Sequence, residues 1–381
     1  MMTSERETFI QTTKPLEPTT MQAFRISQQV TLAVVSVACL WNGMACADEF
    51  QIEKGFVPMF NGTDFSGWQF DQTYTLPEQL PGNWKVEQGV IKLSGGGRPH
   101  LGSQWDYEDF DMRFQCRAMR EKYNSGFFIR SHRKVGNNQI NLAKGGEGRF
   151  FGGKMKGGKP VPELQKPAMQ WNEWRVLVVG DTVKFWCNDQ LAWEGTEFES
   201  KHGHIGLQAE GAPLEFRHLR IQEIGWESLS DPDKWAKTDS DFWKHDRYGL
   251  VFTPVGIARA KPAQNYEDYV FRLEWRAKKT LTGEIGVING NKLTMVRIGD
   301  PNGVVIEGVK PSTTVDNLPG QWNYMQLTFN DDKLSVWQNG SDLVKDFDTT
   351  SGLLVDGGFL VFRANDPGLQ FRNMRIKAIQ R

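Results

Sequence analysis

Arg130 and Glu210 are the residues whose side chains could act most directly on a bound molecule. Arg130 ends a segment of alternating side chains, and its guanidinium could donate to a hydroxyl or to an oxygen that gains negative charge. Glu210 lies in the segment Gln208-Ala209-Glu210-Gly211, where its carboxylate could serve as a general base. A surface arginine beside Arg133 and a solvated turn glutamate are the structural alternatives for these two residues.

Amide and imidazole side chains near these two residues could recognise a ligand. Asn124, Gln139 and Gln208 carry amides that can donate to and accept from ligand hydroxyls, although turn and strand-edge positions explain such residues equally well. His132 and His100 could change charge near neutral pH, but a single histidine more often packs or faces solvent. We place the three amides and His132 among the candidate ligand contacts.

A glycine-rich and basic stretch, 144–159, contains the adjacent aromatic residues Phe150 and Phe151. It lacks the strand, the Gly-Lys-Ser/Thr sequence and the helix of a phosphate-binding loop. A loop over a concave sheet, with Phe150 or Phe151 stacked on the apolar face of a ligand ring, is the functional interpretation. A solvated surface loop is the alternative.

The elements that must position these residues belong to a duplicated domain, because three long phrases recur in one order. They are Tyr107-Glu108-Asp109-Phe110 and Tyr266-Glu267-Asp268-Tyr269, Gln170-Trp171-Asn172 and Gln321-Trp322-Asn323, and Leu214-Glu215-Phe216-Arg217 and Leu369-Gln370-Phe371-Arg372. Recurring residues such as Trp171, Phe216 and Arg217 are explained by a common fold. The segment 124–130 and Glu210 have no such counterpart, so they remain the candidates for function.

Each copy consists of short segments in which polar and apolar residues alternate, separated by turn residues, with almost no helical periodicity. Such strands bury one face and solvate the other. The pattern predicts an all-β fold of two sandwiches in tandem, one over 50–225 and one over 234–381. The connection between them is expected in 225–233, where Ser, Asp and Pro cluster.

Charge and cysteine content narrow the possible partners and ligands. The 381 residues have a formal net charge of -1, which gives no general attraction to nucleic acid or to an anionic membrane. Cys116 and Cys187 lie in alternating stretches on the hydrophobic side, so we expect buried free thiols rather than a disulfide. Two isolated thiols are too few for a metal site, and nothing in the sequence points to a cofactor.

The first 47 residues have the features of a secretory signal. Arg25 precedes an apolar run, 30–40, and Ala45-Cys46-Ala47 forms a small-x-small cleavage sequence before Asp48. Met21 is the preferred start, because the twenty residues before it are polar. A lipoprotein anchored through Cys39 or Cys46 is the alternative, although neither cysteine follows the usual large aliphatic residue. We therefore expect a secreted or periplasmic protein.

Phrases spread over residues 56–224 resemble the 3-keto-disaccharide hydrolase domain family in order and spacing. They are Phe60-Asn61-Gly62-Thr63-Asp64-Phe65-Ser66-Gly67-Trp68, Trp84-Lys85-Val86-Glu87, Asn124-Ser125-Gly126-Phe127-Phe128-Ile129-Arg130, Trp171-Asn172, and Gly206-Leu207-Gln208 with Glu215-Phe216-Arg217. The ensemble is specific even though each phrase alone is weak. The resemblance implies concanavalin-like jelly-roll sandwiches, export and a role in carbohydrate breakdown.

The resemblance has a gap near Gln139. The family shows a glutamate, a glutamine and an aspartate at alternate positions, whereas this chain reads Asn137-Asn138-Gln139-Ile140-Asn141-Leu142 and keeps only the glutamine. If those carboxylates serve the chemistry in relatives, this chain has moved that task or lost it.

The resemblance also implies a particular chemistry. A 3-keto group acidifies the hydrogen on C2, so the glycosidic oxygen can leave from C1 by elimination, after which water adds. This route needs a base near C2, donors for the enolate oxygen and an acid for the leaving group. It does not need the carboxylate pair of ordinary glycosidases. Glu210 and Arg130 of the first copy are the expected base and donor.

Two other functions stay open at this point. A lectin-like protein in which neither copy catalyses is favoured by the missing carboxylates. A purely structural surface protein with two packed sandwiches is the other. The sequence leaves the sugar, the linkage, bound calcium and the oligomeric state open.

We expect the exported protein to begin near Asp48, because signal peptidase cleaves after small-x-small sequences. Intact-mass measurement on the exported protein would check this. Retention of Leu40, or an attached diacylglycerol, would contradict it.

Overall fold

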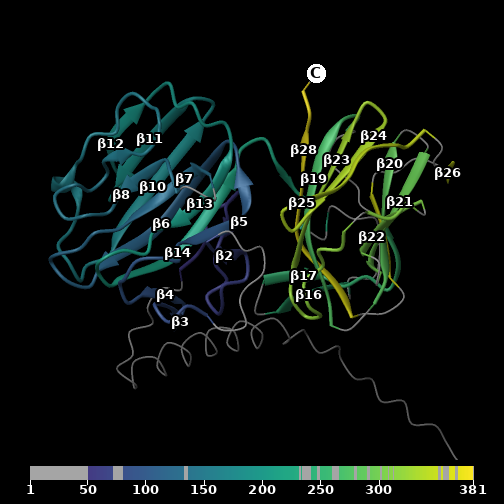
Figure 1. Cartoon of the computed structure of the whole chain (residues 1–381), viewed down its shortest axis with the longest axis horizontal. Helices are drawn as coiled ribbons and strands as arrows, with labels where there is room; N and C mark the ends of the chain where they lie inside the picture. The colour runs from purple at the N-terminus through teal and green to yellow at the C-terminus, as the bar shows by residue number, and fades with distance from the viewer. Residues whose placement is uncertain are drawn as a thin grey trace, which may run out of the picture. The chain divides into compact units, whose positions relative to one another are not determined.

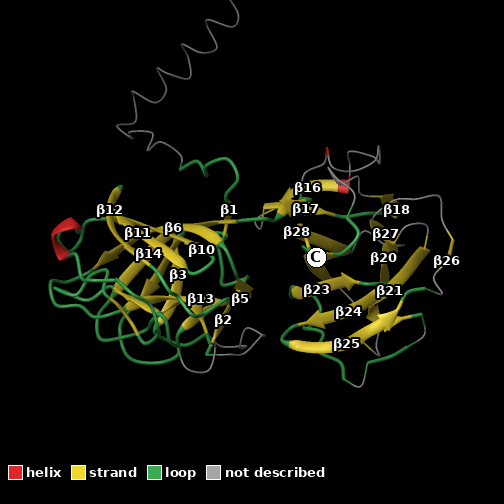
Figure 2. Cartoon of the chain, turned by 90° about the horizontal axis from the view of Figure 1, so that it is seen from above, coloured by secondary structure: helices red, strands yellow, loops and turns green. Residues whose placement is uncertain are grey.

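The computed structural model describes residues 50–71, 80–132, 136–230, 233, 242–246, 249–259, 266–278, 281–289, 292–300, 303–307, 309–311, 313–350, 353–354, 360–364 and 368–380. The predicted signal segment lies outside these residues, as do Arg133 and Lys134. Strands dominate the described part (Figure 1), and helix is confined to short turns such as η1 (Pro162–Leu164), as Figure 2 shows. None of the described helices is long and apolar enough to cross a membrane.

The first copy forms two antiparallel sheets. The larger sheet has the order β12 (Gln190–Gly195), β11 (Thr182–Cys187), β10 (Asn172–Val179), β6 (Phe110–Ala118), β14 (Leu214–Glu223), β4 (Val90–Leu93) and β3 (Trp84–Glu87), with β1 (Val57–Pro58) paired to β14. The smaller sheet has the order β2 (Trp68–Phe70), β5 (Leu101–Tyr107), β13 (Gly203–Leu207), β7 (Gly126–Ser131), β8 (Gln139–Asn141) and β9 (Phe150–Phe151).

The second copy repeats this arrangement. Its larger sheet has the order β16 (Trp243–Asp246), β17 (Gly249–Phe252), β28 (Leu369–Ala378), β19 (Tyr269–Ala277), β23 (Asn323–Asn330), β24 (Lys333–Gln338) and β25 (Ser341–Asp348), with β15 (Glu227–Ser228) paired to β28. Its smaller sheet has the order β18 (Gly256–Arg259), β27 (Leu360–Ala364), β20 (Gly283–Asn289), β21 (Lys292–Asp300) and β22 (Gly303–Ile306), with β26 (Leu353–Leu354) paired to β21. The predicted fold class, two jelly-roll sandwiches in tandem, is confirmed.

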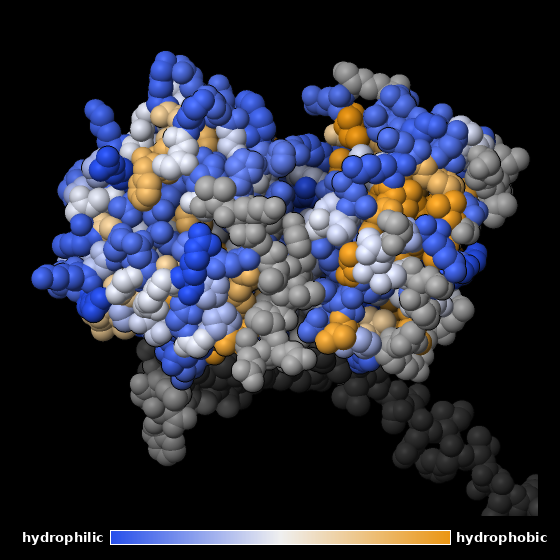
Figure 3. Space-filling view, in the orientation of Figure 1, coloured by the Kyte–Doolittle hydropathy of each residue, from blue (hydrophilic) through white to orange (hydrophobic). Residues whose placement is uncertain are grey.

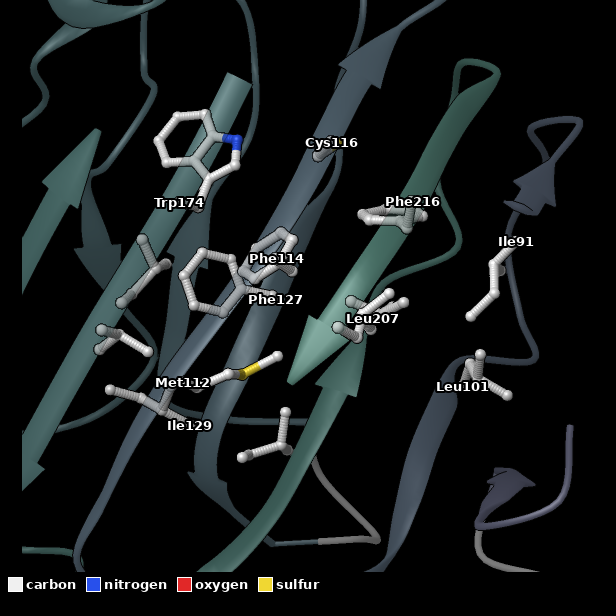
Figure 4. Packing of buried hydrophobic residues seen from close by; sticks show 14 of the residues in the cluster. Ile91, Leu101, Met112, Phe114, Cys116, Phe127, Ile129, Trp174, Leu207 and Phe216 are labelled. Atoms are coloured by element: carbon white, nitrogen blue, oxygen red, sulfur yellow. The ribbon is translucent and has the colours of Figure 1, made fainter. Parts of the chain in front are cut away.

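One row of hydrophobic residues crosses the smaller sheet of the first sandwich and faces the larger sheet. The strand registers align Phe70, Leu101, Leu207, Phe127, Ile140 and Phe150, all of them buried in the core. Figure 4 shows Phe127 facing Phe114 of β6, and their rings meet edge to face with centroids 4.9 Å apart. This packing is the physical reason for the alternation seen in the sequence.

An asparagine pair locks the same corner in both sandwiches. Asn188 Nδ2 donates to Asn172 Oδ1 over 2.9 Å, and Asn339 Nδ2 donates to Asn323 Oδ1 over 2.8 Å. Each acceptor also receives a backbone N–H, from Lys166 in the first sandwich over 2.7 Å. The Asn in each repeated Gln-Trp-Asn phrase therefore satisfies backbone and side-chain donors that would otherwise be buried unpaired.

The tryptophan of that phrase is stacked with two arginines in each copy. The Arg117 and Arg217 guanidinium carbons lie 4.5 and 4.1 Å from the Trp171 ring centroid. The second copy repeats the arrangement around Trp322, with Arg276 at 4.5 Å and Arg372 at 4.0 Å. These cation–π contacts give the repeated aromatic and basic residues a structural role.

Both predicted free thiols are buried in the first sandwich. Cys116 and Cys187 are unpaired, as expected from their place on the hydrophobic side of their strands. Burial raises the pKa of the Cys187 thiol to about 12 and also raises that of Cys116. Thiols held in the protonated form are poor nucleophiles and poor metal ligands.

Residues Ile52–Arg381 form one compact unit that includes both sandwiches. Within it, the Tyr324 hydroxyl accepts a hydrogen bond from the Gly67 amide over 2.7 Å. The buried Arg272 guanidinium donates to the Asp106 carbonyl over 3.0 Å and to a Glu223 carboxylate oxygen over 3.3 Å. Polar groups of each copy are thus satisfied by the other.

Asn172→Ala should lower the free energy of unfolding by about 1–3 kcal/mol, because it leaves the Lys166 amide and the Asn188 side chain without their acceptor. Urea unfolding of the full chain would measure this. The exposed Asn124→Ala is the control and should change the value by less than about 0.5 kcal/mol. Equal stability of the two variants would contradict the locking role.

Candidate functional site

A second row of residues crosses the smaller sheet of the first sandwich on the face turned away from the larger sheet, which we call the outer face. Residues directly opposite each other on neighbouring strands share a face. The registers therefore align Gln69, Gly102, Gly206, Phe128, Gln139 and Phe151 on it. The sheet thus presents amides and aromatic rings around two central glycines.

A neighbouring row on the outer face contains Gln208, Gly126, Asn141 and Arg149. Gly126 pairs with Asn141, the Gln208 amide donates to the Gly126 carbonyl over 2.8 Å, and the Asn141 amide donates to the Arg149 carbonyl over 2.9 Å. Arg149 is exposed and Gln208 and Asn141 are half-buried, whereas Gln139 is only 4% exposed. This row is therefore the more accessible of the two.

The amides of Gln139 and Gln208 are joined across these rows. Gln139 Nε2 donates to Gln208 Oε1 over 2.8 Å. Gly126 makes room for this, because a Cβ there would lie 2.1 Å from Gln139 Nε2. The bond uses one polar group of each amide, so the other group of each can meet a ligand hydroxyl.

Two imidazoles, those of His100 and His204, pack against Phe128 on the outer face. His100 packs against Phe128 with ring centroids 5.4 Å apart, and its Nδ1 accepts from the Ala209 amide over 3.2 Å. Burial lowers the pKa of His100, so the ring is neutral at pH 7 and carries its proton on Nε2. His204 Nδ1 lies 2.6 Å from the Ser131 carbonyl, which can only accept, so the neutral ring has Nε2 as its acceptor nitrogen.

The glycine at position 206 is required for this arrangement. A Cβ there would lie 2.9 Å from Phe128 Cδ2 and 3.4 Å from His204 Cδ2. Sequence reasoning singled out His100 and passed over His204. The signal available in the sequence was the segment Gly203-His204-Ile205-Gly206, in which glycines lie on both sides of the histidine.

Arg130 does not reach the outer face with its guanidinium. The side chain is 1% exposed, and it donates to the carbonyls of Glu108, Gly180 and Ser200 at 2.5, 2.6 and 2.8 Å and to Asp109 Oδ1 at 2.7 Å. Its φ of 41° is unusual for a residue with a side chain. These contacts are sufficient to explain its burial, so its role as a ligand donor stays a prediction.

The two aromatic residues of the basic loop point to opposite faces. Phe150 is 8% exposed and packs edge-on against Phe198 in the core, with centroids 5.8 Å apart. Phe151 lies directly opposite Gln139 on the outer face and is 42% exposed. Of the two rings predicted to stack on a sugar, only Phe151 has an accessible face.

The remaining predicted residues lie around this face. Asn124 is exposed and comes two residues before Gly126, and Glu210 is half-buried two residues after Gln208. The Glu210 carboxylate has no hydrogen bond or ion pair with another described residue. His132 is exposed just beyond the end of β7, where its amide donates to Asn137 Oδ1 over 2.8 Å.

Arg149 is a candidate that sequence reasoning did not single out. It alternates with the buried Phe150, which places it on the same face as Phe151, and its side chain is exposed. No other described residue pairs with its guanidinium. It is the accessible arginine that the predicted donor role requires, and its position beside Phe151 in the loop was the only signal.

In the second sandwich, larger and mutually paired side chains occupy the equivalent rows. Its registers place Arg363, Glu284 and Arg297 where the first sandwich has Gln208, Gly126 and Asn141. Glu284 pairs with Arg363 over 3.0 Å and with Arg297 over 3.6 Å. A carboxylate thus replaces the glycine, and the polar groups of this row are satisfied by each other.

Much of the rest of that face in the second sandwich is hydrophobic. Val361, Met295 and Glu307 stand where the first sandwich has Gly206, Gln139 and Phe151. Ile288, Leu293 and Val361 are buried together with Met295 against them, and Figure 3 shows hydrophobic side chains gathered over β20 and β21. The amide and imidazole groups of the outer face therefore belong to the first copy.

Metal binding finds no support in the part of the chain that the structure describes. No group of three or more His, Cys, Asp or Glu side chains in it is placed to hold an ion. The chemistry available on the outer face is that of amides, imidazoles, a carboxylate, a guanidinium and an aromatic ring.

Comparison with known proteins gives a family for both copies. A family model described as 3-keto-alpha-glucoside-1,2-lyase-like domain matches residues 55–222 and 225–377. A 3-keto-disaccharide hydrolase of Bacteroides thetaiotaomicron is 23% identical over 233 residues, covering 45% of this chain and 79% of that protein.

Solved structures with similar folds are more distant. A Parabacteroides distasonis protein provisionally assigned as a glycosyl hydrolase is 20% identical, with a TM-score of 0.37 over 45% of this chain and 94% of the other. The carbohydrate-binding module CBM66 of Bacillus subtilis is 14% identical, with a TM-score of 0.33 over 42% of this chain and 98% of the other.

Arg130→Met should lower the free energy of unfolding by about 2–4 kcal/mol, because it leaves Asp109 and three buried carbonyls without their donor. The exposed Arg149→Met is the matched control and should change stability by less than about 0.5 kcal/mol. Urea unfolding followed by tryptophan fluorescence would compare them. A fully stable Arg130→Met variant would contradict the structural role and return Arg130 to the list of ligand donors.

Proposed function

Since the chain belongs to the family of 3-keto-alpha-glucoside-1,2-lyase-like domains and contains the domain twice, we propose that its first copy cleaves a 3-keto-glycoside on the outer face. The observation that carries the proposal is the pair of rows on this face. They bring together the linked amides of Gln139 and Gln208, the exposed ring of Phe151 and the guanidinium of Arg149. The second copy replaces all four.

The reaction is an elimination followed by hydration. A base takes the proton from C2, the electron pair forms the enolate of the C3 ketone, and the C1–O bond then breaks as the leaving oxygen takes a proton. Water adds to the C1–C2 double bond, placing hydroxyl on C1 and hydrogen on C2. The ketone lowers the barrier to the first step, so the route needs a base, a donor for the enolate oxygen and an acid for the leaving oxygen, but not the carboxylate pair of ordinary glycosidases.

Glu210 is the proposed base. It is half-buried beside the outer face, and it pairs with no other described residue, so its carboxylate can turn toward a ligand. His204 is a second group of suitable type, because a neutral imidazole that donates from Nδ1 to the Ser131 carbonyl has Nε2 as its acceptor. We assign the base to Glu210 because His204 is only 6% exposed.

Arg149 is the proposed donor to the enolate oxygen, in place of the buried Arg130. A guanidinium stays charged throughout the reaction and can meet the oxygen with two N–H groups. Phe151 would stack on the apolar face of the sugar ring, and the linked Gln139 and Gln208 would bind its hydroxyls. Each of these groups lies on one continuous face of one sheet.

A carbohydrate-binding role without catalysis is the second candidate. It is favoured by the amides at positions 137 and 141, where the family resemblance implies carboxylates. Asn137 Oδ1 already accepts from the Ser131 hydroxyl over 3.0 Å and from the His132 amide, so it holds the sheet edge together.

Export of the protein is proposed on the sequence of its first 47 residues alone.

Product analysis after mixing the purified full chain with matched glycosides and 3-keto-glycosides would test the proposal. We expect cleavage of the 3-keto substrates only. Glu210→Gln should reduce turnover with little change in binding, because the amide keeps the shape but cannot take the proton. Arg149→Ala should lower turnover about a hundredfold or more, as removal of an oxyanion donor does in other enzymes.

Arg297→Ala is the matched control, since Arg297 is an exposed arginine on the corresponding face of the second sandwich. Its turnover should equal that of the parent protein. Parental rates in both Glu210→Gln and Arg149→Ala would overturn the assignment of these groups. Binding of the glycosides without turnover in the parent would favour the carbohydrate-binding role, and Phe151→Ala should then weaken it.

A further inference from the structure

The second sandwich contains a pocket of its own, far in sequence from the outer face of the first. Its volume is about 220 Å³, and it lies where β19 ends beside the turn from β21 to β22. We call it the Asp316 pocket. Its walls include Trp275, Leu281, Gly303, Asp316, Asn317 and Leu318.

The strand registers identify the same place in the first sandwich. Phe127 pairs with Leu207 and Ile140. Ile285 pairs in the same way with Phe362 and Val296, so position 127 corresponds to 285. Four residues earlier, position 123 corresponds to 281. Ile140 pairs with Phe150 as Val296 pairs with Ile306, so position 147 corresponds to 303. The repeated Gln-Trp-Asn phrases make position 165 correspond to 316.

That place is filled in the first sandwich. The Tyr123 hydroxyl donates to Glu147 and accepts from Gln165 Nε2, the latter over 2.7 Å. Tyr123 is 8% exposed and Glu147 is 2% exposed. Two large side chains and their hydrogen bonds therefore occupy the volume that is open in the second copy.

The second copy lacks these side chains and has its carboxylate at a different position. Leucine at 281 and glycine at 303 replace the tyrosine and the glutamate, and Asp316 replaces the glutamine. Gln338 Nε2 holds one Asp316 oxygen at 2.5 Å, and Trp275 Nε1 in turn donates to Gln338 Oε1 over 3.0 Å. The carboxylate is thus fixed in position at the wall of the pocket.

Other polar groups on the walls are also acceptors. Asp300 lines the pocket, and Asn317 Oδ1 is buried with no hydrogen-bond partner among the described residues. The donors of Asn317 are already used, its Nδ2 by the Trp322 carbonyl and its backbone N–H by Asn323 Oδ1, both over 2.7 Å. Thr314 and Gln321 also line the pocket and can both donate and accept, whereas the carboxylates favour a ligand that brings hydrogen-bond donors.

The remaining walls are apolar. Trp275, Leu281 and Leu318 can meet C–H surface, while the Asp316 carboxylate can meet a hydroxyl group on the edge of the same molecule. A neutral sugar residue combines these properties in one ring. The described residues offer no set of three acidic, histidine or cysteine groups that would favour a metal ion.

We propose that the Asp316 pocket is a binding site for one residue of a neutral saccharide, separate from the outer face of the first sandwich. The second copy is then a sugar-binding domain whose site lies at the end of the sandwich rather than on the sheet. This assignment does not depend on catalysis by the first copy. It follows from a pocket in the second copy at a place where the first copy has the paired side chains of Tyr123 and Glu147.

Titration of the full chain with D-glucose, D-galactose and D-mannose, followed by calorimetry and by saturation-transfer NMR, would test the proposal. We expect saturable binding of at least one of them, roughly in the millimolar range for a molecule of this size. D-glucosamine is the cationic comparison. Binding of the amine alone would overturn the assignment to a neutral sugar, and absence of saturable binding would overturn the site.

Two variants locate the binding. Leu281→Tyr restores the side chain of the first copy and should abolish binding by filling the pocket. Asp316→Asn keeps the shape and should weaken binding at least about tenfold, because a charged acceptor is lost. If thermal unfolding shows that Leu281→Tyr does not fold, Asp316→Asn still tests the site.

Asp342→Asn is the matched control, because it neutralises an exposed aspartate of the second sandwich that does not line the pocket. It should bind the monosaccharides as the parent does. Loss of binding in Gln139→Ala, with parental binding in Asp316→Asn, would place the sugar on the outer face and overturn the proposal. Turnover of 3-keto-glycosides is not used as a readout, so failure of this site and failure of the catalytic proposal are distinguishable.

Discussion

The packing of Phe127 between the two sheets of the first sandwich sets the register on which the site depends. Its ring meets Phe114 of the larger sheet edge to face, with centroids 4.9 Å apart, and its strand neighbours Leu207 and Ile140 are also buried. Because side chains alternate along a strand, a shift by one residue would turn this whole row outward. The same constraint sends Phe128 and Gln139 to the outer face. The core therefore decides which polar residues a ligand can meet.

The two copies show which parts of the domain can change once that core is fixed. The asparagine pairs and the tryptophans stacked with arginines recur with nearly the same distances, because they satisfy buried groups of the fold. The residues on the outer face and at the end of the sandwich are not needed in this way to satisfy buried groups of the fold. On the outer face, Gly126 of the first copy corresponds to Glu284 of the second, which binds two arginines. At the end of the sandwich, a place that is filled in the first copy is a pocket in the second.

Burial separates two arginines of the first copy that are similar as sequence features. Arg130 donates four hydrogen bonds to main-chain carbonyls and to Asp109, so its charge is compensated inside the protein. Arg149 is exposed on the outer face, beside Phe151. Our assignment of the donor role moved from the first to the second for this reason. Glu210 kept its proposed role because no other described residue pairs with its carboxylate.

The sequence by itself determined the duplication, the sandwich fold of each copy, the family and the burial of both thiols. These follow from repeated phrases and from alternation, which are local or periodic properties of the chain. Tertiary structure alone decided that Phe150 packs inward while Phe151 is exposed, that His204 lies over glycines of neighbouring strands, and that Leu281 and Gly303 leave a pocket beside Asp316. Each depends on the register between strands distant in sequence, and register is set by the packing of the whole core.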